Sequence, residues 1–163
     1  MSSYLATYHI DNWEVLARLL LAAALGFAVG FDRSIKNKPL GFRPFMLVSL
    51  GSCLFAVTIL ELTAGALPAD IADRVDVSRV YQGLIGGIGF LGAGAIIQSR
   101  SGGVRGSATG AGIWLVGGIG LSVGFGLYFI AIAASVIAVI VFVLFGLLRE
   151  EVDEKTEDLN DKK

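Results

Sequence analysis

Apolar residues run through this chain in five long stretches, separated by short polar or glycine-containing segments. The stretches cover residues 15–31, 45–66, 80–97, 108–123 and 127–148. Each is near the length of roughly 20 residues that a helix needs to cross about 30 Å of hydrocarbon. Because a backbone in lipid must satisfy its own hydrogen bonds, the pattern predicts an all-α membrane protein with a bundle of about five transmembrane helices. A bundle of four, with one of the last two stretches re-entrant, stays open.

The composition places the chain among integral membrane proteins. Of its 163 residues, 55% are hydrophobic and 17% are charged, and a water-soluble domain could not cover that much apolar surface. The net charge of −1 gives no sign of a nucleic-acid partner. One cysteine, Cys53, and one histidine, His9, leave no intrachain disulfide and no two-histidine metal site. No Lys or Arg precedes Arg18, so we expect the first stretch to be retained rather than cleaved as a signal peptide.

Basic residues gather in alternate connecting segments. Segments 32–44, 98–107 and 149–163 together hold ten of the 13 lysines and arginines, whereas Arg74 and Arg79 lie on the opposite side. The positive-inside rule then predicts an outer N-terminus and a cytoplasmic C-terminus. An odd number of spans gives this alternation, which favours five helices over four. We expect an outer arm at 1–14, a transmembrane domain at 15–148 and a charged cytoplasmic tail at 149–163.

The segment GGIGFLGAG, residues 86–94, contains the pattern G-x-G-x-x-G. In a soluble α/β protein this pattern is typical of dinucleotide binding. That fingerprint also needs a strand before it and an acidic residue about 20 residues later. Here the pattern lies inside an apolar stretch and another apolar stretch follows it, so we expect neither a nucleotide nor another cofactor.

The glycines predict close packing between helices instead. At 100° per residue, Gly83, Gly87 and Gly94 lie within about 40° of one another, and Gly110 and Gly117 are seven residues apart. Small residues allow transmembrane backbones to approach closely. The third and fourth stretches are therefore expected to pack on each other or on a second subunit. The alternative is that these glycine-rich helices line a site.

Arg18 and Glu61 are ionisable residues inside apolar stretches. Both would lie about 8–10 Å inside the outer ends of their helices, at 1.5 Å per residue. An ionised group in a span costs several kcal/mol unless it is paired, hydrated or able to reach the interface. We predict an intramembrane ion pair between Arg18 and Glu61. The alternative is that each side chain snorkels separately to the interface.

Three segments, in order along the chain, carry a resemblance to a known family. The first segment contains Gly30–Phe31–Asp32–Arg33, followed by KPLGFR and LVSLGSCLF. The second is DVSRVYQGLIGGIGFLGAGAII, from Asp76, and the third is VRGSATGAGIW, from Val104. This arrangement resembles the MgtC/SapB family of bacterial membrane proteins, from about residue 18 to 128. The resemblance implies a multi-pass protein of the bacterial inner membrane, in a family linked to growth in low magnesium and to virulence. It also implies action on another membrane complex, such as the membrane ATP synthase.

The chain departs from the family pattern at several positions. Asp32 stands where the family usually has Glu, and Val77 stands where Pro is usual. Larger relatives carry a soluble C-terminal domain, and the 15 residues after Leu148 are too few for one. Activities that depend on that domain are not carried over.

The polar residues that match the family lie where the apolar stretches end. Asp32 and Arg33 form either an interfacial ion pair or a carboxylate site facing a cytoplasmic vestibule. Asp76 is expected to cap the third helix. The functional polar candidates are Asp32, Arg33, Arg43, Asp76, Arg79, Gln82, Arg105 and Thr109. No cluster of residues has the composition of a metal site, so none is expected.

Three classes of function compete. A regulator or adaptor would bind another membrane complex through apolar, glycine-lined helices, with membrane lipids and further copies of the chain as its other partners. A channel or transporter would carry a small ion or solute, magnesium among them. An enzyme would need a nucleophile with a base, or a metal cluster, and the sequence shows neither. The regulator is the expected function, in the form of a homo-oligomer, and the transporter is the alternative.

Overall fold

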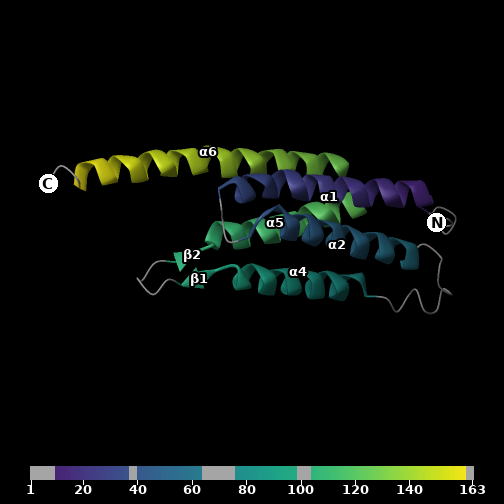
Figure 1. Cartoon of the computed structure of the whole chain (residues 1–163). Coiled ribbons are helices and arrows are strands. Elements are labelled where there is room, and N and C mark those ends of the chain that lie inside the picture. The colour runs from purple at the N-terminus through teal and green to yellow at the C-terminus, as the bar shows by residue number, and fades with distance from the viewer. Residues whose placement is uncertain (1–9, 37–39, 64–75, 99–103, 161–163) are drawn as a thin grey trace.

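A computed structural model describes residues 10–36, 40–63, 76–98 and 104–160 of this chain. The described residues form long helices that run alternately in opposite directions along one common axis (Figure 1). In chain order they are α1 (Asn12–Ile35), α2 (Phe42–Glu61), α4 (Val77–Gly94), α5 (Ser107–Gly124) and α6 (Tyr128–Asn160). The predicted all-α membrane architecture is confirmed. Residues 1–9, most of the expected outer arm, lie outside the described residues.

The helices extend beyond the apolar stretches from which they were predicted. α1 begins at Asn12, before the first apolar stretch, and continues through Asp32 and Arg33 to Ile35. α6 continues through the acidic tail to Asn160, because Glu, Lys and Leu are good helix formers once a helix has been nucleated. The segment expected as a charged tail is therefore helical as far as residue 160.

Three of the helices, α1, α2 and α5, are long and apolar enough to cross a membrane. The apolar part of α6 covers the shorter segment Tyr128–Leu144. α4 is not among these candidates, because six of its 18 residues are glycine and its first two turns include Arg79 and Gln82. Length and composition thus support membrane insertion most strongly for the part of the bundle that packs most closely.

α5 is the central helix and contacts all four others. Its glycines make this possible: a side chain at Gly120 would overlap the backbone of Ser49 in α2, and one at Gly124 would overlap Ala56. α1 also lies closely on α2, since Gly26 and Gly30 would place a Cβ within 2.7 Å and 2.8 Å of α2 backbone atoms. α1, α2 and α5 therefore form a tightly packed core.

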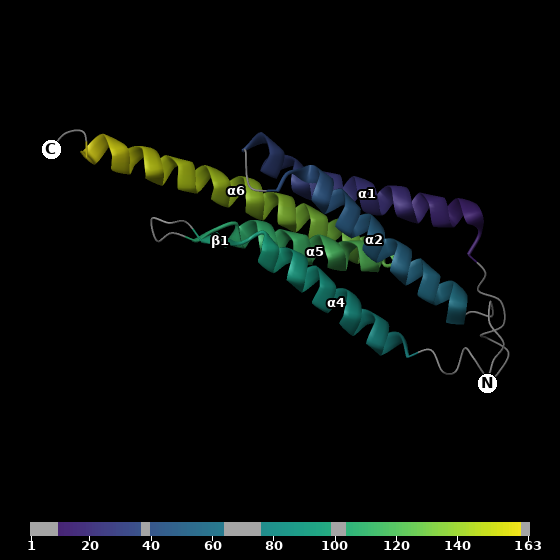
Figure 2. The same cartoon turned by 60° about the horizontal axis from the view of Figure 1, so that its bottom comes forward.

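α4 lies at the edge of the bundle, next to α5 (Figure 2). Two short strands follow it, β1 (Ile97–Gln98) and β2 (Val104–Arg105), which pair antiparallel with Ile97 opposite Arg105. Ile97 was predicted as the last residue of the third apolar stretch, and Gln98 and β2 were predicted as part of the segment that follows it. Gly106 follows β2 as the N-cap of α5 and has φ of 90°, a conformation that L-residues with a side chain rarely adopt. α5 starts immediately afterwards.

Candidate functional site

The end of the bundle that holds the start of α1 is built around Arg18. This residue is 2% exposed. Its Nη1 donates to the carbonyl of Gly124 at 2.7 Å, and its Nε donates to the hydroxyl of Tyr128 at 3.1 Å. Its Nη2 pairs with Glu14, one turn earlier on α1. Arg18 therefore ties α1 to the turn between α5 and α6.

The predicted ion pair between Arg18 and Glu61 is wrong in its choice of partner. Arg18 pairs with Glu14, which lies four residues away on the same helix face. The carbonyl of Gly124, the last residue of α5, supplies a further acceptor at the negative end of that helix. Glu61 instead accepts the backbone N–H of Ile10 at 3.0 Å. The carboxylate of Glu61 thus holds the chain that leads into α1.

The opposite end carries a cluster of three charged residues, Asp32, Arg33 and Lys36, here called the α1 end cluster. Lys36 Nζ lies 3.1 Å and Arg33 Nη2 3.9 Å from the Asp32 carboxylate. The Arg33 guanidinium lies over the ring of Phe142 in α6, 3.7 Å from its centroid. None of the three side chains is more than 15% exposed. The cluster is therefore a packed contact between α1 and α6 rather than an exposed interfacial pair.

A neighbouring contact connects α1 to α2. The hydroxyl of Ser34 accepts the backbone N–H of Phe42, the first residue of α2, at 2.9 Å. Arg43 is exposed on the first turn of the same helix. Thr109 lies buried in the first turn of α5, and Arg105 lies in β2. Among the described residues, no hydrogen bond or ion pair links Arg43 or Thr109 to the α1 end cluster, so the candidates do not form a single site there.

The candidates that were predicted to lie on the outer side are at the start of α4. Asp76 caps this helix as predicted, with its Oδ1 accepting the backbone N–H of Ser78 at 3.0 Å. Its Oδ2 accepts from Arg79 Nε at 3.1 Å. Both side chains are exposed, Arg79 to 84%, and Gln82 is also exposed. Asp76 and Arg79 are thus a surface pair at the start of α4.

The predicted packing glycines divide into two groups. On α5, Gly110 approaches the carbonyl of Gly92 and Gly117 contacts Ile88, both on α4. On α4, by contrast, a Cβ at Gly83, Gly87 or Gly94 would meet no atom within 4 Å. The expectation that the third and fourth helices pack on each other is correct, but α4 uses Gly92 and Ile88 rather than the three glycines chosen from the sequence.

Several close-packed glycines were missed by sequence reasoning. Gly26 and Gly30 on α1 are buried against α2, and they form a G-x-x-x-G pattern that could have identified them. Gly120 on α5 approaches the α2 backbone in the same way. Cys53 is fully buried in α2.

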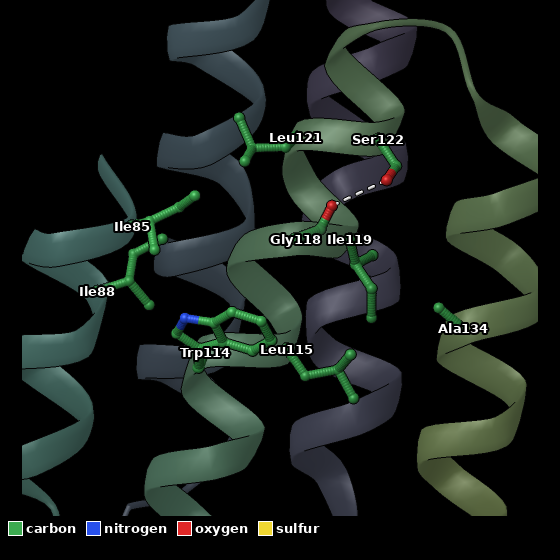
Figure 3. Close-up of a pocket in the computed structure, with 9 residues that line it drawn as sticks. All are labelled: Ile85, Ile88, Trp114, Leu115, Gly118, Ile119, Leu121, Ser122 and Ala134. Carbon is green, nitrogen blue, oxygen red and sulfur yellow. Dashed lines mark hydrogen bonds between the residues drawn. The ribbon is translucent and has the colours of Figure 1, made fainter. Parts of the chain in front are cut away.

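Two hollows flank α4, and both are apolar. One, of about 250 Å³, lies between α4, α5 and α6 and is lined by residues such as Ile85, Trp114 and Ala134 (Figure 3). Its one polar lining side chain, Ser122, donates to the carbonyl of Gly118 at 2.9 Å. The other, of about 690 Å³, is an open groove between α2 and α4 whose polar lining side chain is Ser52. Among the described residues, no group of three His, Cys, Asp or Glu side chains could hold a metal ion.

Comparison with known proteins identifies the family. Residues 19–151 match the sequence profile described as the MgtC family. The chain is 32% identical to an uncharacterized protein of Haemophilus influenzae, over 93% of this chain and 64% of that protein. It is 34% identical to Protein SapB of Bacillus subtilis, over 76% of this chain and 53% of SapB. It is 35% identical to the putative magnesium transporter YhiD of Escherichia coli, over 83% of this chain and 62% of YhiD.

The matched regions thus cover between 53% and 64% of the length of these three relatives. No solved structure matches the chain significantly. The profile match covers most of the helical bundle, from α1 into α6. This chain therefore belongs to the MgtC family.

Proposed function

We propose that this protein is a multi-pass regulator or adaptor in the bacterial inner membrane, without enzymatic activity, and that it acts by packing its helices against another membrane complex. The membrane ATP synthase is one such complex that the family resemblance suggests. The observation that carries the proposal is the closed packing of α1, α2 and α5. A Cβ at Gly120 would overlap the α2 backbone, and one at Gly112 would lie 2.8 Å from Phe142. A core without space for added methyl groups suits a rigid scaffold better than a conduction path.

The charged side chains support the same proposal. Asp32 is engaged with Lys36, Glu14 with Arg18, and Asp76 with Arg79. A transport site near mid-bilayer would more often present polar or ionisable groups to a cavity. Here the pairs lie toward the ends of the helices, and the two hollows beside α4 have mainly apolar linings. Carboxylates that are already paired contribute to packing and orientation.

One observation favours a second candidate function. The relative from Escherichia coli that is 35% identical to this chain is named a putative magnesium transporter. In that case the charged residues at the two ends would form vestibules of a gated path, with Asp32 as the cytoplasmic carboxylate. Movement of α4, which is held mainly by α5, would then open the path between them.

Flux through reconstituted protein separates the two candidates. We expect purified protein in liposomes to show no Mg²⁺ or other ion flux above empty liposomes, measured with an encapsulated fluorescent indicator. The matched variant is Asp32→Asn, which removes the charge at one end and keeps the side-chain volume. Flux by the wild-type protein that disappears in folded Asp32→Asn would replace the regulator with the transporter.

A further inference from the structure

Most glycines of α4 have open space beside them in the single chain. Of the six glycines in this helix, only Gly92 meets a neighbouring atom within 4 Å of an added Cβ. The other five are Gly83, Gly86, Gly87, Gly89 and Gly94. A glycine in a helix interior costs about 1 kcal/mol relative to alanine. Within a membrane this cost is offset where the missing side chain lets another backbone approach.

The side of α4 that packs on α5 is opposite to its main glycine face. Tyr81 contacts Phe125 with ring centroids 5.4 Å apart, Ile88 contacts Gly117, and Gly92 contacts Gly110. At 100° per residue, these three α4 residues lie between about 140° and 180° from Gly83. Gly83, Gly87 and Gly94 lie within about 40° of one another on the other side. The neighbouring helix therefore does not account for the glycine face.

A large apolar side chain projects from the same face. Phe90 lies about 20° from Gly83 around the helix and is 80% exposed. It stands between Gly87 and Gly94, at about 4.5 Å and 6 Å along the axis. The projecting Phe90 side chain and the low surface at the glycines thus lie side by side. We call this surface the α4 face and define it by Asp76, Arg79, Gly83, Gly87, Phe90 and Gly94.

We propose that the α4 face binds the α4 face of a second copy of this chain, in a symmetric dimer. Copies inserted in the same orientation share a twofold axis along the membrane normal, so their α4 helices lie parallel at equal depth. Phe90 of each copy then meets the depression between Gly87 and Gly94 of the other. The surface is self-complementary, as a twofold interface requires.

The charges at the start of α4 fit the same arrangement. Asp76 and Arg79 lie on the α4 face and carry opposite charges, with side chains 51% and 84% exposed. Across a parallel twofold contact, Asp76 of one copy approaches Arg79 of the other. The groove between α2 and α4, lined by Gly51, Gly83 and Gly87 among others, continues this surface. In that groove Ser52 is 1% exposed and its hydroxyl has no hydrogen-bond partner among the described residues.

The dimer goes beyond the proposed function, because a regulator and a transporter could both form it. Its test therefore needs no flux measurement. Cys53 is the one native cysteine, so a Cys53→Ala background allows single cysteines to be placed at will. Phe90→Cys and Gly87→Cys should form disulfide-linked dimers in native membranes under mild oxidation. Gly89→Cys is the matched control, since Gly89 is also open but lies about 120° away from Gly83 around the helix.

Substitution by leucine tests the same contact in purified protein. Gly87→Leu should raise the dissociation constant of the dimer by about tenfold or more, because the added side chain separates the two backbones. Gly89→Leu should leave it within about twofold. Both leucines enter open space in the single chain and favour helix formation, so the fold should persist. Light scattering with size-exclusion chromatography and circular dichroism would measure association and fold.

Four outcomes would overturn the proposal. The first is a monomer both in detergent and in native membranes; the second is equal cross-linking at residues 87 and 89; the third is an equal effect of the two leucine variants. The fourth is a monomeric chain whose residue 87 cross-links to a different membrane protein or contacts lipid alone. The first three remove the α4 face as a self-association surface. The last assigns this face to another occupant, while the flux result for Asp32→Asn stays independent of all four.

Discussion

Removal of the Arg18 side chain should weaken the whole bundle at one end. Arg18 lies in α1 but donates to Gly124 at the end of α5 and to Tyr128 at the start of α6. The variant Arg18→Met keeps most of the side-chain length and removes all of its donors. We expect it to unfold more easily, with α1 losing its polar attachment to the turn between α5 and α6.

The contacts give the size of this effect. A hydrogen bond to a charged group contributes about 1.5–3 kcal/mol net, and Arg18 makes two of these to buried or half-buried acceptors on other helices. Its pair with Glu14 adds less, because Glu14 is 43% exposed and exposed pairs contribute up to about 1 kcal/mol. Arg18→Met also removes the cost of burying a cation. We therefore expect a loss of about 2–4 kcal/mol in the free energy of unfolding.

Double-mutant cycles identify the partners. Unfolding in mixed micelles with increasing sodium dodecyl sulfate, followed by circular dichroism, gives the free energy for each variant. We expect coupling of about 1–2 kcal/mol between Arg18→Met and Tyr128→Phe, and up to about 1 kcal/mol between Arg18→Met and Glu14→Gln. Arg18→Met and Glu61→Gln should be additive within about 0.5 kcal/mol. Coupling to Glu61 that equals or exceeds the coupling to Tyr128 would refute this reasoning.

Two further predictions concern packing and topology. Gly120→Ala should lower the free energy of unfolding by about 1–3 kcal/mol, because its methyl group would meet the α2 backbone at Ser49. The control Gly118→Ala places its methyl group in open space on the same helix and should be neutral or stabilising. Equal losses for the two variants in the same unfolding assay would contradict the α2–α5 contact. Asp11 and Arg43 are both exposed, and single cysteines at these positions should lie on opposite sides of the membrane. In intact cells an impermeant maleimide should label Asp11→Cys and not Arg43→Cys. Labelling of both from one side would exclude the proposed orientation.

The sequence alone determined the architecture and the family. Five apolar stretches predicted the helical bundle because a backbone in lipid has few alternatives to the helix. The cap formed by Asp76 was also predictable, since it depends on residues within two positions of one another. The order of the three family-matching segments carried the resemblance that the profile match confirms. All of these features are local or follow directly from the order of residues along the chain.

The tertiary structure decided which residues meet. Arg18 had several acceptors within reach of a long side chain, and the position of the turn at Gly124 and Tyr128 selected its partners. Periodicity placed Gly83, Gly87 and Gly94 on one face of α4, but only the rotation of that helix relative to α5 showed that this face points away from α5. A helical pattern fixes angles within one helix, whereas the direction of its neighbours depends on packing among residues distant in sequence.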